Sequence, residues 1–249
     1  PTVFFRVETR NSIPTAAGLA SSASGFAALA LALNDFFGWD LPHNHLSILA
    51  RLGSGSACRS IFLGFVEWEA GADEDGMDSF AVPLSTQWPE LRIGVLTISE
   101  DQKAISSREA MKRTRRTSSL YESWPVKVAH DLALIKEAIE GRNFELLGQT
   151  AESNALAMHA TALAAWPPIL FWHPRTVSII HDIWALRENG LPIYFTIDAG
   201  PNIKLLFPQT IENEVRNVFP DATVIAPFSD PAQTAKTTTP SPAQPSTPT

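Results

Sequence analysis

The sequence predicts an α+β protein, and three observations support this fold class. Two stretches rich in β-branched and aromatic residues, "TVFFRVET" (2–9) and "LRIGVLTIS" (91–99), have the composition of strands. A third strand, "PIYFTI" (192–197), runs into the glycine-containing loop "DAGPN". Apolar residues at helical spacing predict helices at about 21–37, 44–52, 126–140, 144–164 and 174–188.

The first ninety residues combine strand, loop and helix. A loop of small residues (11–20) joins the first strand to the helix at 21–37, whose apolar residues on nearly every face predict burial. After the second helix come the glycine-serine stretch "GSGSACRS" (53–60) and a strand, "IFLGFVEWEA" (61–70). The acidic segment "DEDGMD" (73–78) predicts a turn.

A domain change is expected near Leu91. Residues 1–90 then form one domain and 91–228 a second, which begins with the buried strand and continues through a polar, basic segment (100–121) into the later helices. Residues 229–249, rich in Pro and Thr, contain almost no large apolar side chain. Such a segment cannot bury enough surface to offset its ordering entropy, so we expect a disordered tail.

Composition excludes several classes of protein. The formal net charge of -7 argues against nucleic-acid and membrane partners, which attract basic surfaces. Cys58 is the single cysteine, so no internal disulfide can form and a reducing, cytoplasmic compartment is expected. No apolar run approaches the roughly 20 residues that cross a bilayer.

Small residues before the helix at 21–37 predict a phosphate-binding loop. A helix N-terminus carries unpaired N–H groups and partial positive charge, and small residues let phosphate oxygens reach that backbone. Gly-Lys-Ser/Thr and the three spaced glycines of other phosphate loops are absent. Tight packing of the helix on a sheet is the alternative interpretation. The candidate residues are Ala17, Gly18, Leu19, Ala20, Ser21 and Ser22.

The order of residues in this loop resembles the phosphate motif of the superfamily of galactokinase, homoserine kinase, mevalonate kinase and phosphomevalonate kinase. "GSGSACRS" followed by "GFVEWEAG", and "TIDAGPN" (196–202), are similar to signatures of the diphosphomevalonate decarboxylase family within it. "RRTSSLY" (115–121) and "ESNALAMHATALAAWPPI" (152–169) resemble that family in the same order. The resemblance implies a ribosomal-S5-like N-terminal part, incomplete here, and a ferredoxin-like C-terminal part.

The resemblance implies ATP-dependent decarboxylation of mevalonate 5-diphosphate to isopentenyl diphosphate. Asp198 would contact the substrate 3-hydroxyl, and Arg59 would orient the carboxylate that leaves as carbon dioxide. Taken alone, Asp198 also suits a helix N-cap or an Asx turn, and Arg59 a surface ion pair. Mg²⁺ is expected to arrive with ATP, without a metal site of the protein's own.

The same resemblance assigns the remaining polar residues. Ser54, Gly55, Ser56 and Ser118 would bind substrate, although serines between glycines are commonly turn formers. Lys103 would belong to a loop that closes over the nucleotide. This chain departs from the family there, with Gln102 for a Lys and Ala110 for a Gly.

Two residues invite functional interpretations that we set aside. His159 has no second metal ligand at helical spacing, which favours a packed, hydrogen-bonded histidine. Cys58 lacks a nearby base and is interpreted as a small buried residue.

A basic cluster follows in the segment 100–121, at Lys112, Arg113, Arg115 and Arg116. It suits a solvated helix face at least as well as a phosphate site.

Three hypotheses remain open at this stage. They are a decarboxylase of this family, a related mevalonate or phosphomevalonate kinase or decarboxylase, and an inactive truncated paralogue. The expected partners are mevalonate diphosphate and ATP, with a homodimer left open. Pro1 is not an initiator Met, so we expect the chain to begin inside a longer gene product or to be a processed or truncated form. The family carries a substrate-binding N-terminal region that has no counterpart here, so we expect residues 1–249 alone to show no turnover.

Overall fold

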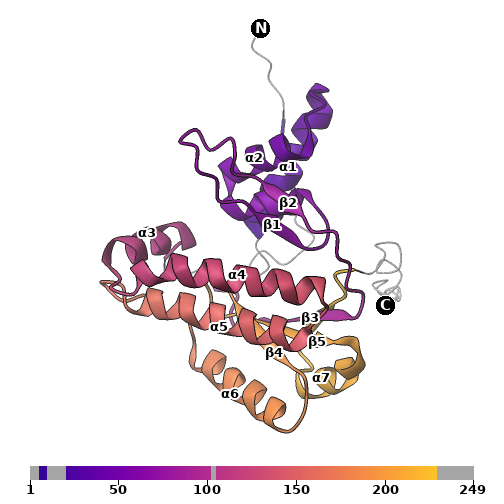
Figure 1. Ribbon diagram of the computed structural model, residues 1–249, viewed down its shortest axis with the longest axis vertical. Coiled ribbons are helices and arrows are strands. Elements are labelled where there is room, and N and C mark those ends of the chain that lie inside the picture. The colour runs from indigo at the N-terminus through magenta and orange to yellow at the C-terminus, as the bar shows by residue number, and fades with distance from the viewer. Residues whose placement is uncertain (1–5, 10–20, 102–104, 229–249) are drawn as a thin grey trace, which may run out of the picture.

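A computed structural model describes residues 6–9, 21–101 and 105–228. Within these residues the fold is α+β, as predicted, and every pairing between strands is antiparallel (Figure 1). One sheet contains β1 and β2, and a second has the strand order β4-β5-β3-β6. The loop at 11–20, Lys103 and the tail at 229–249 lie outside the described residues.

The N-terminal part packs two helices on a short sheet. Its elements are α1 (Ser21–Phe37), α2 (His43–Gly53), the 3-10 helix η1 (Gly55–Ile61), β1 (Val66–Trp68) and β2 (Ala81–Pro83). Only one face of α1 is buried, through Ala23, Ala27 and Ala30. Phe36 on the outer side is 66% exposed, so the prediction of an all-round buried helix is wrong within the described chain.

Two further predictions for this part need correction. The described residues 6–9 of the first expected strand are not in a strand. The strand expected at 61–70 is limited to Val66–Trp68, because η1 occupies its beginning. A strand exists only where another strand supplies hydrogen bonds, and β2, which pairs with β1, was not predicted.

The C-terminal part contains most of the regular structure. The expected helices at 126–140, 144–164 and 174–188 are confirmed to within two residues at each end. β5, α7 and β6 were not predicted. The elements are β3 (Leu91–Leu96), α3 (Ser107–Thr117), η2 (Tyr121–Ser123), α4 (Trp124–Glu140), α5 (Phe144–Leu163), α6 (Pro174–Glu188), β4 (Tyr194–Ile197), β5 (Ile203–Pro208), η3 (Gln209–Ile211), α7 (Glu212–Val218) and β6 (Thr223–Ile225).

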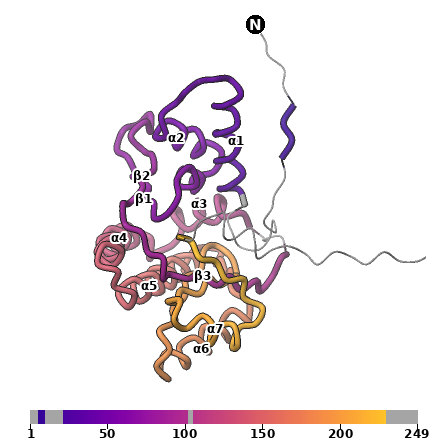
Figure 2. Tube along the Cα trace, turned by 90° about the vertical axis from the view of Figure 1, so that its right-hand side faces the viewer, coloured from indigo at the N-terminus to yellow at the C-terminus, as the bar shows by residue number. Residues whose placement is uncertain are grey.

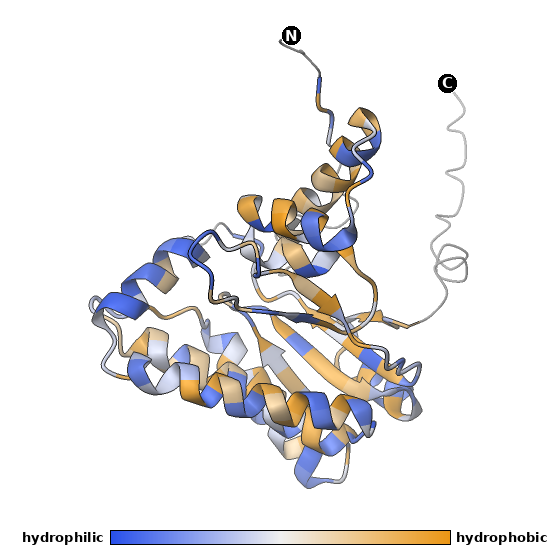
Figure 3. Cartoon of the chain, turned by 45° about the horizontal axis from the view of Figure 1, so that its top comes forward, coloured by the Kyte–Doolittle hydropathy of each residue, from blue (hydrophilic) through white to orange (hydrophobic). Residues whose placement is uncertain are grey.

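The four-stranded sheet has helices on both faces. Alternate residues of β4 and β5, including Phe195 and Leu205, are fully buried in a core with α6 and α7. Tyr194 points to the opposite face, where its ring lies so close to Gly148 of α5 that a Cβ on Gly148 would clash. Figure 3 shows the hydrophobic residues concentrated along these strands. The helices therefore hold the β4–β5 hairpin in place from two sides.

The two parts meet along α4 and the segment that leads into β3 (Figure 2). Lys136 of α4 forms a 2.7 Å ion pair with Glu67 of β1. Phe65, Trp88 and Phe144 pack in one cluster that spans both parts. None of the described helices is long and apolar enough to cross a membrane.

Candidate active site

Asp198 lies directly after β4, in the loop of the β4–β5 hairpin. Its Oδ1 accepts a 2.6 Å hydrogen bond from the Nζ of Lys204, and its side chain is 50% exposed. The loop continues without a helix, so the helix N-cap interpretation of Asp198 is wrong. Its carboxylate is therefore held by a cation and remains open to solvent.

The antiparallel register explains why Asp198 and Lys204 meet. Thr196 of β4 is paired with Lys204 of β5, and Asp198 follows Thr196 by two residues, on the same face of the hairpin. Asn202 fixes the loop between the strands, because its side-chain oxygen accepts from the backbone N–H groups of Ile98 and Ser99. This loop is thus anchored to the end of β3.

His159 of α5 packs beneath the same loop. It is 2% exposed, and burial lowers its pKa from 6.5 to about 4, although the backbone and charge of Asp198 act in the opposite direction. The imidazole is therefore neutral at physiological pH. The expected packing of His159 is therefore confirmed. Its Nε2 has no hydrogen-bond partner among the described residues, so hydrogen bonding at this nitrogen is not confirmed.

The buried His159 predicts a loss of stability in acid. Because its folded pKa, about 4, lies below the ordinary 6.5, the unfolded chain takes up the proton first as pH falls. Stability that is present above pH 6.5 is then lost progressively towards about pH 4. The thermal unfolding midpoint should show this fall, and the variant His159→Gln should lack its contribution.

The exposed His130 of α4 supplies the matched control. The variant His130→Gln should keep the acid-induced fall of the parent protein. An identical pH dependence in His159→Gln and the parent would contradict this assignment of the effect to His159.

The structure brings two of the predicted phosphate and substrate segments together. The hydroxyl oxygens of Ser22, in the first turn of α1, and Ser54, at the end of α2, lie 3.2 Å apart. The segment of Ser54, which precedes η1, and Gly55 and Ser56, which begin it, therefore lies beside the N-terminus of α1, where helix N–H groups are unpaired. Cys58 is fully buried, as expected, and burial raises the pKa of its thiol.

Arg59 is exposed near the end of η1, and its guanidinium lies over the ring of Trp68 in β1. The guanidinium carbon lies 5.9 Å from the centre of the Trp68 ring, and the Trp68 indole N–H donates to the Ser79 hydroxyl. A Cβ on Gly55 would lie 3.0 Å from the same ring, so glycine allows the ring to approach the loop. The surface ion pair considered for Arg59 is not seen among the described residues.

The other predicted site residues lie apart from these groups. Ser118 is buried at the end of α3, and its hydroxyl accepts from the Leu120 N–H. The hydroxyl of the neighbouring Thr117 accepts from the backbone N–H of Trp166. No hydrogen bond or ion pair between described residues joins Ser118, Arg59 or Ser54 to Asp198. The candidates Ala17, Gly18, Leu19, Ala20 and Lys103 lie outside the described residues, and so does the side chain of Ser21.

Sequence reasoning missed Lys204 and Trp68. A lysine inside an apolar strand, in "IKLLF", was the available signal for Lys204, because an isolated buried charge needs a partner. Trp68 is part of the motif "GFVEWEAG", but no function was predicted for it. Its contact with Arg59 depends on how β1 folds back on η1, which the sequence does not show.

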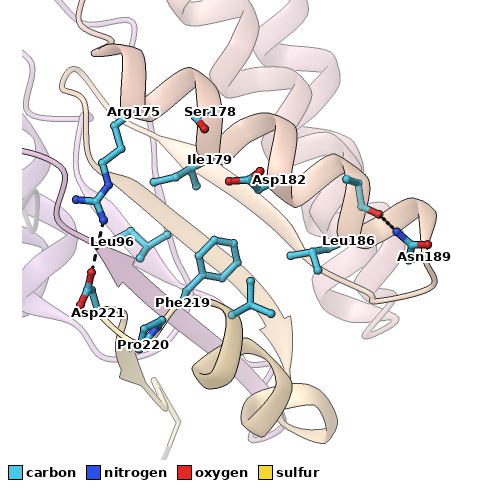
Figure 4. Close-up of a pocket in the computed structure, with 12 residues that line it drawn as sticks. Leu96, Arg175, Ser178, Ile179, Asp182, Leu186, Asn189, Phe219, Pro220 and Asp221 are labelled. Carbon is cyan, nitrogen blue, oxygen red and sulfur yellow. Dashed lines mark hydrogen bonds and ion pairs between the residues drawn. The ribbon is translucent and has the colours of Figure 1, made fainter.

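A hollow of about 490 Å³ lies elsewhere, between α6 and α7 (Figure 4). Arg175 and Asp221 form a 3.4 Å ion pair on one side of it. It contains none of the predicted site residues. Within the described part of the chain, no group of three or more His, Cys, Asp or Glu residues could hold a metal ion.

Two family models match the chain. Residues 1–81 match the diphosphomevalonate decarboxylase-like N-terminal domain, and residues 93–247 match the mevalonate 5-diphosphate decarboxylase C-terminal domain. The diphosphomevalonate decarboxylase of Aspergillus fumigatus is 40% identical over 215 residues, which are 83% of this chain and 52% of that protein. The chain thus spans about half the length of the curated relatives it matches.

Solved structures give the same result. The structure described as "MDDEF in complex with MVAPP, AMPPCP and Magnesium" matches with a TM-score of 0.80 and 42% identity, over 85% of this chain and 67% of that one. A structure of the mevalonate diphosphate decarboxylase from Enterococcus faecalis matches with a TM-score of 0.79 and 42% identity, over 85% of this chain and 66% of that one. At this identity, both the fold and the family are shared.

Proposed function

We propose, from the premise that this chain belongs to the diphosphomevalonate decarboxylase family, that it serves the ATP-dependent decarboxylation of mevalonate 5-diphosphate. The products would be isopentenyl diphosphate, ADP, phosphate and carbon dioxide, a step in isoprenoid and sterol biosynthesis. The observation that carries the proposal is the exposed, lysine-paired carboxylate of Asp198 in the "DAGPN" loop.

Each proposed role follows from the chemistry of the reaction. The tertiary 3-hydroxyl needs a carboxylate that can orient it and accept its proton, and Asp198 is exposed and held by a cation. The departing carboxylate needs a planar, two-pronged cation, which Arg59 offers from its position over Trp68. Ser22, Ser54 and Ser56 would donate hydroxyls to phosphate oxygens near the N-terminus of α1.

We infer that the nucleotide is ATP with Mg²⁺, in line with the relative described with AMPPCP and magnesium. The nucleotide phosphates would carry the magnesium ion. Ala17, Gly18, Leu19, Ala20, Ser21 and Lys103 remain proposed nucleotide-binding residues, and Ser118 a proposed substrate-binding residue.

The domain division also remains a proposal. We propose a ribosomal-S5-like domain that includes residues 1–90, a ferredoxin-like domain at 91–228, and a tail at 229–249. The start of β3 at Leu91 and the antiparallel four-stranded sheet support this division.

The proposed function is tested by carbon dioxide release. The complete gene product is mixed with ATP, Mg²⁺ and mevalonate 5-diphosphate, and carbon dioxide and isopentenyl diphosphate are measured. We expect both products from the diphosphate and neither from mevalonate or its 5-phosphate. Phosphorylation of either of those two compounds, without turnover of the diphosphate, would contradict the proposal in favour of a kinase.

A further inference from the structure

We infer that Lys204 is a positioning residue, which fixes the direction of the Asp198 carboxylate in the active site. The inference rests on the proposed decarboxylase function, because it assigns Lys204 a role in the same reaction. It begins from the 2.6 Å hydrogen bond between Lys204 Nζ and Asp198 Oδ1.

The two partners differ in their freedom to move. The Lys204 side chain is 12% exposed, whereas that of Asp198 is 50% exposed. Lys204 is the second residue of β5 and is paired on both sides, with Thr196 of β4 and Val95 of β3, so its backbone has a fixed position. A largely buried, fixed ammonium group can hold a carboxylate in one orientation, while the exposed carboxylate remains accessible to a ligand.

The backbone of the loop is fixed independently of Lys204. The Gly200 N–H donates to the Asp198 carbonyl at 2.7 Å. Asn202 closes the loop onto β3 by accepting from the Ile98 and Ser99 N–H groups and donating to the Ser99 carbonyl. These bonds place the Cα of Asp198 without setting its side-chain torsions. Among the described residues, the carboxylate itself is hydrogen-bonded by Lys204 alone.

Lys204 engages one carboxylate oxygen and leaves the other available. No described residue donates a hydrogen bond to Oδ2, so this oxygen can accept from the substrate hydroxyl. The titratable group that faces the pair from α5 is His159, which is neutral at physiological pH and so does not replace the lysine as a cation. The positive charge next to Asp198 within the described chain therefore comes from Lys204.

The test is a double-mutant cycle in the complete gene product. Lys204→Met keeps the length of the stem and removes the ammonium group, and we expect kcat to fall about tenfold or more with little change in KM. Lys204→Arg keeps a cation and should recover at least part of the loss. In an Asp198→Asn background, Lys204→Met should cause no further loss of kcat, because its effect acts through the carboxylate.

A matched control distinguishes this effect from loss of any paired lysine. Lys127 of α4 forms a 3.0 Å ion pair with Asp131, away from the hairpin, and Lys127→Met should leave kcat unchanged. Unfolding midpoints are measured on every variant to identify those that do not fold. If Lys204→Met does not fold, the cycle is completed with Lys204→Arg, alone and combined with Asp198→Asn.

Three results would overturn the inference. The first is a normal kcat and KM in Lys204→Met. The second is a raised KM with unchanged kcat in that variant, which would make Lys204 a substrate-binding residue. The third is a full additional loss of kcat when Lys204→Met is added to Asp198→Asn. Failure of the proposed function gives a different result, an inactive parent protein, which would overturn both proposals. Activity in the parent together with any of the three results would overturn the role of Lys204 alone.

Discussion

Replacing Asp198 with Asn is expected to lower the kcat for carbon dioxide release at least about a hundredfold, the usual scale for loss of an acid–base group. Asn keeps the size of the side chain and its ability to accept a hydrogen bond, but it removes the negative charge that Lys204 pairs with. Binding of mevalonate diphosphate should survive, because the residues proposed to bind phosphate lie on other elements. The measurement is single-turnover carbon dioxide release together with substrate affinity.

The Arg175–Asp221 ion pair offers a matched control for this substitution. Asp221 is also a carboxylate paired with a cation, but it lies on the surface beside α6, and Asp221→Asn should leave activity within about twofold. Near-normal turnover in Asp198→Asn would refute the proposed role of this carboxylate.

Replacing Arg59 with Lys is expected to lower kcat/KM about tenfold or more. Lys retains the charge but lacks the planar fork that binds both oxygens of a carboxylate, and it stacks less well on an aromatic ring than guanidinium does. The Trp68 ring, 5.9 Å from the guanidinium carbon, therefore makes the exchange unfavourable even without substrate. Steady-state kinetics with mevalonate diphosphate provide the measurement.

Arg175 supplies the corresponding control, since Arg175→Lys changes an exposed guanidinium in the same way and should not alter kcat/KM. Equal activity of Arg59→Lys and Arg175→Lys would remove Arg59 from the proposed site. Combined with the result for Asp198, this comparison tests the proposed contacts with the substrate 3-hydroxyl and with its carboxylate separately.

Much of the helical structure could be predicted because its signals are local. The period of apolar residues sets the bounds of α1 and α6, and Pro174 suits the first helical position. Strands were predicted less well. The stretch at 61–70 has the composition of a strand throughout, yet only Val66–Trp68 finds a partner, and β2, β5 and β6 contain too few residues or too little alternation to be recognised.

For the candidate site, the sequence placed Asp198 in a loop after a strand and predicted that the segments around Ser22 and Ser54 bind phosphate groups. Their proximity at 3.2 Å agrees with that expectation, while the binding roles remain predictions. The alternatives for Asp198 could not be separated from sequence, since a helix N-cap, an Asx turn and a carboxylate that contacts substrate all suit an Asp before "AGPN".

By itself, therefore, the sequence determined the family, most of the long helices and the identity of the candidate polar residues, because motifs and helical periods are properties of neighbouring residues. Only the tertiary structure decided which of these residues touch. The Asp198–Lys204 pair depends on the register of two antiparallel strands, and the neutral state of His159 depends on burial beneath their loop. The contact of Arg59 with Trp68 likewise requires β1 to fold back on η1. Register, burial and packing are set by free energies shared among distant segments, which no single stretch of sequence contains.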